Sequence, residues 1–190
     1  MAQSKNILIC GVGGQGTVLA SKIISESALS NGEHVLSAET IGMAQRGGSV
    51  VSHVRIGEDV YSPLIGENEA DCLIAFEASE AVRNISYLKK DAFVVVNKSV
   101  VQPVTASLTG KIFDVNEMIE ALQKVTKNVV VVDTESACKE LGSSKVINMV
   151  LLGALCKANV FNVEEICRSM KKLVKPQFYE LNEKALFYTE

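Results

Sequence analysis

The sequence predicts an α/β fold in which a mostly parallel β-sheet carries helices on both faces. Two observations lead to this expectation. Short apolar runs, such as residues 6–11 (NILICG) and 71–76 (DCLIAF), are typical of strands that are buried on both sides. Apolar residues at helical spacing follow the first run, at Leu19, Ile23, Ile24 and Ala28. Strands alternate with helices up to about residue 133 and helices alone follow, which predicts a helical C-terminal part.

Further strands are expected where β-branched residues cluster. These segments are residues 34–39, 49–56, 92–97 and 128–133. Residues 60–65 (VYSPLI) are expected to form a short strand at an edge of the sheet, because Pro63 cannot donate a hydrogen bond to a ladder.

The expected helices have start and stop signals. The first should end at residues 31–32 (Asn-Gly), and the last should begin near Pro176, a residue suited to a first helical turn. A helix is also expected after the 71–76 strand, continuing to about Leu88. Residues 146–155 are apolar nearly all round, which predicts a central and buried helix.

Composition limits the possible functions. The chain has 190 residues, of which 47% are apolar and 22% charged, and this fits one domain spanning residues 1–190. A net charge of −3 without a basic cluster speaks against nucleic acid as a partner. No apolar run is long enough to span a membrane, and the N-terminus lacks the profile of a signal peptide. We therefore expect a cytoplasmic protein that does not bind a membrane.

The five cysteines are spread along the chain, and no two lie within four residues of each other. The spacing therefore offers no ligand set for zinc or an iron–sulfur cluster, and we expect no metal site. The odd number fits reduced thiols. Four of them fall on apolar faces and are interpreted as small core residues: Cys10, Cys72, Cys156 and Cys167.

The first predicted strand runs into a turn with the pattern G-x-G-x-x-G, which opens a helix and makes a Rossmann-like sheet the expected architecture. The candidate phosphate-binding residues are Gly11, Gly13, Gly14, Gln15, Gly16 and Thr17. Glycines let backbone approach a phosphate at the positive end of a helix. A dinucleotide also needs an acid after the second strand, where Glu39 is the candidate. A tight turn that binds nothing explains the pattern equally well, and both interpretations stay open.

An unusual loop follows the second predicted strand, in the stretch ETIGMAQRGGSVVSHVRIG, residues 39–57. A thioether, an amide and a guanidinium stand between glycines, which is more than a surface turn needs. Together with GVGGQGTVLASKI, residues 11–23, this stretch resembles the gamma domain of the 2-oxoacid:ferredoxin oxidoreductases. Within that family it is most similar to the small beta subunit of the indolepyruvate:ferredoxin oxidoreductase branch. The resemblance covers essentially the whole chain.

The resemblance implies a part in oxidative decarboxylation of a 2-oxoacid, with indolepyruvate or another aryl pyruvate favoured. Coenzyme A takes the acyl group as cosubstrate and ferredoxin takes the electrons. The family reaction uses thiamine diphosphate with magnesium, and 4Fe-4S clusters. This sequence has neither the G-D-G motif of such thiamine sites nor grouped cysteines. The resemblance therefore implies a cofactor-free chain, inactive alone, that completes the site of a large alpha subunit carrying both cofactors.

The resemblance also implies roles for the unusual loop. Gln45 and Arg46 are expected to border the active site of the complex, since Arg46 offers a planar fork of donors to a carboxylate or phosphate. Residues expected to contact the partner are Gly42, Met43, Gly47 and Gly48. A guanidinium that caps a carbonyl or pairs with Glu39 on the surface is the simpler alternative for Arg46. A subunit of this kind should expose an apolar patch and could self-associate when alone.

Other polar residues have simpler interpretations. His53 is expected to be a satisfied structural histidine, Arg55 a solvated or interface residue, and Lys98 a surface residue. Residues 175–182 (KPQFYELN) could either dock a partner or pack the last helix onto the sheet. The competing hypothesis for the whole chain is a stand-alone nucleotide- or flavin-binding Rossmann module, which leaves the loop of residues 42–48 unexplained.

Overall fold

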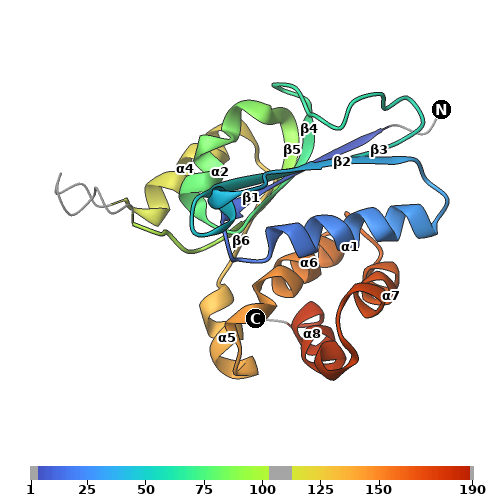
Figure 1. Cartoon of the computed structure of the whole chain (residues 1–190). Helices are drawn as coiled ribbons and strands as arrows, with labels where there is room; N and C mark the ends of the chain where they lie inside the picture. The colour runs from blue at the N-terminus through green and yellow to red at the C-terminus, as the bar shows by residue number, and fades with distance from the viewer. Residues whose placement is uncertain (1–3, 103–112, 189–190) are drawn as a thin grey trace.

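The computed structural model describes residues 4–102 and 113–188, so both ends of the expected 1–190 domain lie outside the described part. Its centre is a six-stranded sheet in the order β2-β3-β1-β4-β5-β6 (Figure 1). The strands are β1 (Lys5–Val12), β2 (Val35–Glu39), β3 (Ser49–Ile56), β4 (Ala70–Ala75), β5 (Leu88–Asn97) and β6 (Val129–Val132).

The sheet is mostly parallel, as predicted, with β3 as the exception. Strands β1, β4, β5 and β6 pair in parallel, whereas β3 runs antiparallel to both of its neighbours, β1 and β2. The third strand of the chain therefore lies between the first and the second. The connection between β2 and β3 reverses the chain, so these two strands pair antiparallel as neighbours in sequence, while the pairing of β3 with the distant β1 sets the strand order.

Helices cover both faces of the sheet (Figure 1). One face carries α1 (Thr17–Ser30), α5 (Thr134–Leu141), α6 (Ile147–Lys157), α7 (Val163–Leu173) and α8 (Tyr179–Leu186). The other carries α2 (Ala78–Arg83) and α4 (Val115–Val125). Each face has its own apolar core, one centred on β1 with α1 and α6, the other on β4 and β5 with α2. The apolar helix α6 lies at the middle of its layer, as its all-round apolar sequence predicts.

Several predicted boundaries are confirmed. Helix α1 is followed by Asn31 as its C-terminal cap and by Gly32 with φ of 78°, a conformation that favours glycine. Pro176 begins the 3₁₀ turn η4 (Pro176–Phe178) that leads into α8. The helix expected to reach Leu88 is shorter than predicted. Helix α2 ends at Arg83, a 3₁₀ turn η2 (Ile85–Tyr87) follows, and Leu88 already belongs to β5.

The edge strand expected at residues 60–65 is wrong, because this segment is a loop. Its backbone groups are satisfied by side chains of β3 and not by a ladder. The guanidinium of Arg55 donates to the carbonyls of Ser62 and Leu64, at 3.3 and 3.0 Å. The N–H of Ile65 donates to Nδ1 of His53 at 3.2 Å. Pro63 fits this irregular path because it has no N–H to satisfy.

Candidate functional site at the carboxyl edge of the sheet

The two motifs singled out in the sequence meet in space at the carboxyl end of β1. The glycine turn, residues 11–16, leaves β1 there, and the loop of residues 42–48 leaves β2 next to it. We call the latter the glycine-flanked loop. The N–H of Gly13 donates to the carbonyl of Gly48 at 2.8 Å, which joins the two segments. The sequence predicted that this loop lies at the carboxyl side of the sheet, and the structure places it there.

Gly13 is where the two motifs touch most closely. A Cβ atom built on Gly13 would lie 2.3 Å from the carbonyl oxygen of Ala44 and 2.4 Å from the carbonyl carbon of Gln45. In a dinucleotide fold this glycine leaves room for a pyrophosphate. Here the backbone of the glycine-flanked loop takes that room. Gly11 is equally confined, since its Cβ would lie 2.8 Å from Cβ of Phe76.

The glycine-flanked loop is held together by its own hydrogen bonds. It contains the 3₁₀ turn η1 (Met43–Gln45), which is closed by a bond from the N–H of Arg46 to the carbonyl of Met43 at 3.0 Å. A further bond runs from the N–H of Gly48 to the carbonyl of Ala44 at 2.8 Å. Gly42 and Gly47 have φ of 90° and 96°, so the path of the loop requires glycine at both positions. The side chain of Gln45 folds back and donates to the carbonyl of Thr40 at 3.1 Å. Gln45 thus has a structural contact inside the loop.

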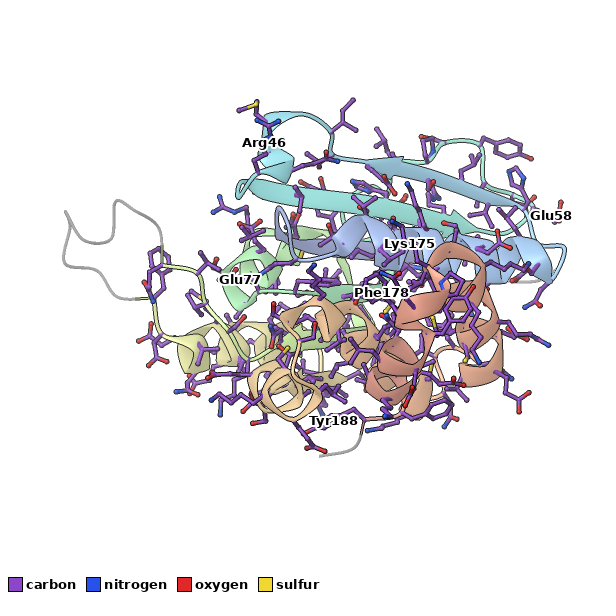
Figure 2. All side chains as sticks on the ribbon, turned by 60° about the horizontal axis from the view of Figure 1, so that its bottom comes forward. Arg46, Glu58, Glu77, Lys175, Phe178 and Tyr188 are labelled. Carbon is purple, nitrogen blue, oxygen red and sulfur yellow. The ribbon has the colours of Figure 1, made fainter. Side chains whose placement is uncertain are left out.

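The remaining side chains of this region point into solvent. Met43 is 76% exposed, and Ile41 just before the loop is also exposed. The guanidinium of Arg46 forms no hydrogen bond or ion pair with the residues that the structure describes, and it stands at one end of the sheet (Figure 2). The surface ion pair with Glu39 that the sequence left open is absent from the described residues. Glu39 instead accepts a hydrogen bond from Ser21 at 2.6 Å.

A cavity of about 600 Å³ opens beside the glycine turn. Its walls include Gly14, Gly16, Thr17 at the start of α1, Lys22 one turn further on, and Leu173 at the end of α7. The first N–H groups of a helix have no partner within the helix and attract negative charge. Gln15 faces inward, since its amide oxygen accepts from the N–H of Val12 at 2.7 Å. Gly13 also lines the cavity, but its N–H already donates to the carbonyl of Gly48. Gly14, Gly16 and Thr17 therefore remain for a ligand, while Gly11 and Gln15 serve the turn itself.

Two buried carboxylates support this edge of the sheet, and neither was predicted from the sequence. Glu80 accepts a hydrogen bond from Ser49, the residue directly after the glycine-flanked loop, at 2.5 Å. Glu77, fully buried, accepts from the N–H groups of Glu80 and Val101, both at 2.8 Å. The available signal was an acid just after a buried strand with a second acid three residues later, which is typical of a helix N-terminus.

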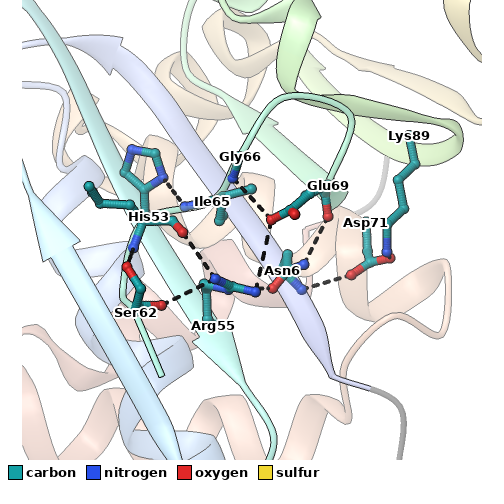
Figure 3. A network of polar contacts seen from close by, with 10 residues as sticks. Asn6, His53, Arg55, Ser62, Ile65, Gly66, Glu69, Asp71 and Lys89 are labelled. Atoms are coloured by element: carbon teal, nitrogen blue, oxygen red, sulfur yellow. Dashed lines mark hydrogen bonds and ion pairs between the residues drawn. The ribbon is translucent and has the colours of Figure 1, made fainter. Parts of the chain in front are cut away.

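His53 and Arg55 lie away from this site, and both are structural. Burial lowers the pKa of His53, and its Nδ1 atom accepts from Ile65, as expected for a neutral, satisfied imidazole. Arg55 was expected to be either solvated or at an interface, and the solvated alternative is wrong, while its place at an interface stays a prediction. Its side chain is only 17% exposed and also donates to Asn6 at 2.9 Å (Figure 3).

The remaining candidates divide between surface and core. Lys98 is exposed after β5. In the 175–182 segment Tyr179 packs against the core, as one alternative expected, and Phe178 is 40% exposed. Docking of a partner by this segment stays a prediction. Burial raises the pKa of Cys72 to about 12 and that of Cys156 to about 11, which fits core thiols.

Within residues 4–102 and 113–188, no three His, Cys, Asp or Glu side chains gather as metal ligands. In the same residues, no helix is long and apolar enough to cross a bilayer.

Comparison with known proteins decides the family. The family model described as pyruvate ferredoxin/flavodoxin oxidoreductase matches residues 6–188. The chain belongs to this family. It is 40% identical to indolepyruvate oxidoreductase subunit IorB of Archaeoglobus fulgidus, over 95% of this chain and 91% of the relative. It is 29% identical to the pyruvate/ketoisovalerate oxidoreductases common subunit gamma of Pyrococcus abyssi, over 92% of this chain and 89% of that one.

The fold is shared with a solved subunit of the pyruvate ferredoxin/flavodoxin oxidoreductase family. Pyruvate oxidoreductase subunit PORC of Thermotoga maritima superimposes with a TM-score of 0.70 over 97% of this chain and 94% of that one, at 24% identity. The chain is thus a small subunit of a 2-oxoacid:ferredoxin oxidoreductase, an enzyme of several subunits. The hypothesis of a stand-alone nucleotide- or flavin-binding module is not favoured.

Proposed function

We propose that this chain is the small subunit of an indolepyruvate-type 2-oxoacid:ferredoxin oxidoreductase. One observation carries the choice of substrate class. The chain shares 40% sequence identity with an indolepyruvate oxidoreductase subunit, against 29% with a common gamma subunit of pyruvate and ketoisovalerate oxidoreductases. The reaction is the oxidative decarboxylation of an aryl pyruvate, with coenzyme A as acyl acceptor and ferredoxin as electron acceptor.

The cofactors belong to a large alpha subunit in this proposal. Thiamine diphosphate with magnesium supplies the decarboxylation chemistry there, and 4Fe-4S clusters conduct the electrons. The residues of this chain do not fit either group, since the sequence has no G-D-G motif and no grouped cysteines. The chain therefore contributes surface and positioning, and works in the cytoplasm only as part of the complex.

The glycine-flanked loop is the part of this chain that we place beside the active site. Its support is the contrast between an internally bonded backbone and an exposed Arg46 whose guanidinium pairs with none of the described residues. A guanidinium held out by a rigid loop can bind a carboxylate of the 2-oxoacid or a phosphate of coenzyme A with two parallel hydrogen bonds. Gln45 braces the loop, while Met43 contacts the partner subunit together with backbone at Gly42, Gly47 and Gly48.

The cavity beside the glycine turn is the second element of the proposal. The phosphate-binding prediction concentrates on Gly14, Gly16 and Thr17, because these residues line the cavity together with Lys22. A helix N-terminus and an ammonium group on one wall favour an anionic ligand. Titration of the complex with coenzyme A, comparing wild type with Lys22→Ala, tests this element, and equal affinities would exclude it.

Reconstitution tests the function as a whole. Co-expression of the chain with its large subunit should yield a complex that oxidises aryl pyruvates with ferredoxin or a dye acceptor. A panel of aryl, branched and short 2-oxoacids then measures the preference through kcat/KM. The isolated chain should be colourless and inactive. Iron bound to the purified chain, or a complex that prefers pyruvate over aryl pyruvates, would contradict the proposal.

A further inference from the structure

A second candidate surface lies at the other end of β3. The loop of residues 57–69, which joins β3 to β4, begins where the eight-residue strand β3 ends. At about 3.3 Å per residue, that strand places Ser49 and Ile56 roughly 23 Å apart. Figure 2 shows Arg46 and Glu58 toward opposite ends of the strand layer at the top of the view. The 57–69 loop is therefore separate from the site described above.

The 57–69 loop presents two large apolar side chains to solvent. Tyr61 is 88% exposed and Leu64 is 59% exposed, with Pro63 between them. The residues on either side, Val60 and Ile65, are buried and fix the loop to the sheet. Water disfavours such an exposed pair, and a subunit of a complex gains by covering it.

The loop is held in one conformation by contacts to β1 and β3 (Figure 3). Arg55 donates to the carbonyls of Ser62 and Leu64, and His53 accepts from Ile65. At the end of the loop, the carboxylate of Glu69 accepts from the N–H of Gly66 at 3.1 Å. A surface that is already ordered loses little conformational entropy on binding. Tyr61 and Leu64 are thus presented on a prepared scaffold.

Charge on the loop is of one sign. Its ionisable residues other than Tyr61 are all acidic: Glu58, Asp59, Glu67 and Glu69. The neighbouring guanidinium of Arg55 is turned inward onto the loop's own carbonyls and Glu69, and the nearby ammonium of Lys89 pairs with Asp71. The ammonium of Lys5, which is in register with Ile56, lies over the ring of Phe161, 5.8 Å from its centroid. The surface therefore has an apolar centre with an acidic rim, and it attracts a basic surface.

We propose that the 57–69 loop is a second docking surface, which binds a basic surface with an apolar centre on the large subunit. The identity of this partner rests on the proposed function. A second copy of this chain fits poorly, because a symmetric contact would bring the same acids against one another. Anionic lipid headgroups and nucleic acid would be repelled for the same reason. The small subunit then contacts the large subunits of the assembled enzyme at both ends of its sheet.

Binding measurements on purified subunits test this surface. Leu64→Asp should weaken the affinity for the large subunit at least ten-fold, and Tyr61→Ala by a similar factor, since central apolar residues dominate interface energetics. Leu29→Asp is the matched control, because Leu29 is 55% exposed at the end of α1, and it should change the affinity less than two-fold. Glu58→Lys combined with Asp59→Lys should slow association and reduce its salt dependence.

The outcomes separate this proposal from the proposed function. When the small subunit is added to saturation, the complex formed with the Leu64→Asp variant should reach the full wild-type turnover. The complex formed with the Arg46→Ala variant should not. Wild-type affinity of a correctly folded Leu64→Asp variant overturns the docking surface and leaves the proposed function intact. Loss of self-association with unchanged affinity for the large subunit assigns the loop to a contact between copies and overturns the choice of partner. If the wild-type chain does not bind the large subunit, both proposals are wrong.

Discussion

The carbonyl oxygen of Ala44 lies 2.3 Å from the point where a side chain on Gly13 would begin. A glycine that would otherwise admit a phosphate is used by the chain to seat its own loop. The hydrogen bond from Gly13 to Gly48 completes the contact. The two sequence motifs of this family are therefore one structural unit, in which the glycine turn supports the loop that carries Arg46.

A methyl group at position 13 should disturb that unit. Gly13→Ala places Cβ against backbone, which cannot move aside as a flexible side chain can. Overpacking of this kind typically costs about 1–3 kcal/mol, and the loop should become more mobile. Urea unfolding and hydrogen exchange of residues 42–48 measure both effects. Gly66→Ala is the control, because its nearest neighbour at 3.1 Å is the side chain of Glu69, which is 51% exposed and can move aside, so it should cost less than Gly13→Ala. Equal stability of the two variants would show that the close approach is unimportant.

Much of the fold follows from local sequence signals. Buried strands such as β4 and the apolar helix α6 were predictable because their residues are apolar on every side. The position of β3 between β1 and β2 was not predictable, because strand order depends on pairing between distant segments. The loop at residues 60–65 misled because a short, largely apolar run containing a proline also fits an edge strand. Its backbone is instead bonded by Arg55 and His53, two side chains of β3.

The candidate site was predictable in part. The sequence indicated the glycine-flanked loop through its composition, and the structure places it at the expected edge of the sheet. The sequence contains no sign that the Gln45 side chain folds back onto Thr40 while the Arg46 side chain bonds to none of the described residues. That difference depends on the direction of each side chain. Glu77 and Glu80 were missed since their burial arises only when α2 packs against the ends of three strands.

Ser49 should anchor the glycine-flanked loop through Glu80. Ser49→Ala removes one hydrogen bond from a buried carboxylate, which then keeps Arg83 as its side-chain donor. Leaving a buried acceptor short of a donor costs about 1–3 kcal/mol. Unfolding in urea measures this cost. Ser79→Ala should cost less, because Glu77 retains two backbone donors. A larger effect at Ser79 than at Ser49 would contradict this assignment.

His53 should make stability depend on pH. Burial lowers its pKa in the folded state, so the unfolded chain binds the proton more readily. The contribution of the neutral imidazole is complete above the unfolded pKa of about 6.5 and is lost as the pH falls from there through the lower folded pKa. The urea midpoint of wild type should therefore decline more between pH 7.5 and 5 than that of His53→Asn. Parallel declines in both proteins would show that His53 does not titrate across this range.

Arg46 provides the sharpest test of the proposed site. Arg46→Ala should leave the fold and its stability unchanged, because Arg46 is exposed and its guanidinium forms no hydrogen bond or ion pair with the described residues. In the assembled enzyme it should lower turnover or raise the KM for coenzyme A or the 2-oxoacid. Losing one charge-assisted contact costs about 1.5–3 kcal/mol, or roughly ten- to a hundred-fold. Arg46→Lys should recover only part of the loss, since an ammonium group cannot form two parallel bonds.

Arg168→Ala, which removes an exposed guanidinium from α7, is the control for loss of charge. Steady-state kinetics on the reconstituted complex decide the matter, with subunit association measured separately. Wild-type kinetics would remove Arg46 from the site, and weakened assembly with normal chemistry would make the loop an interface element alone.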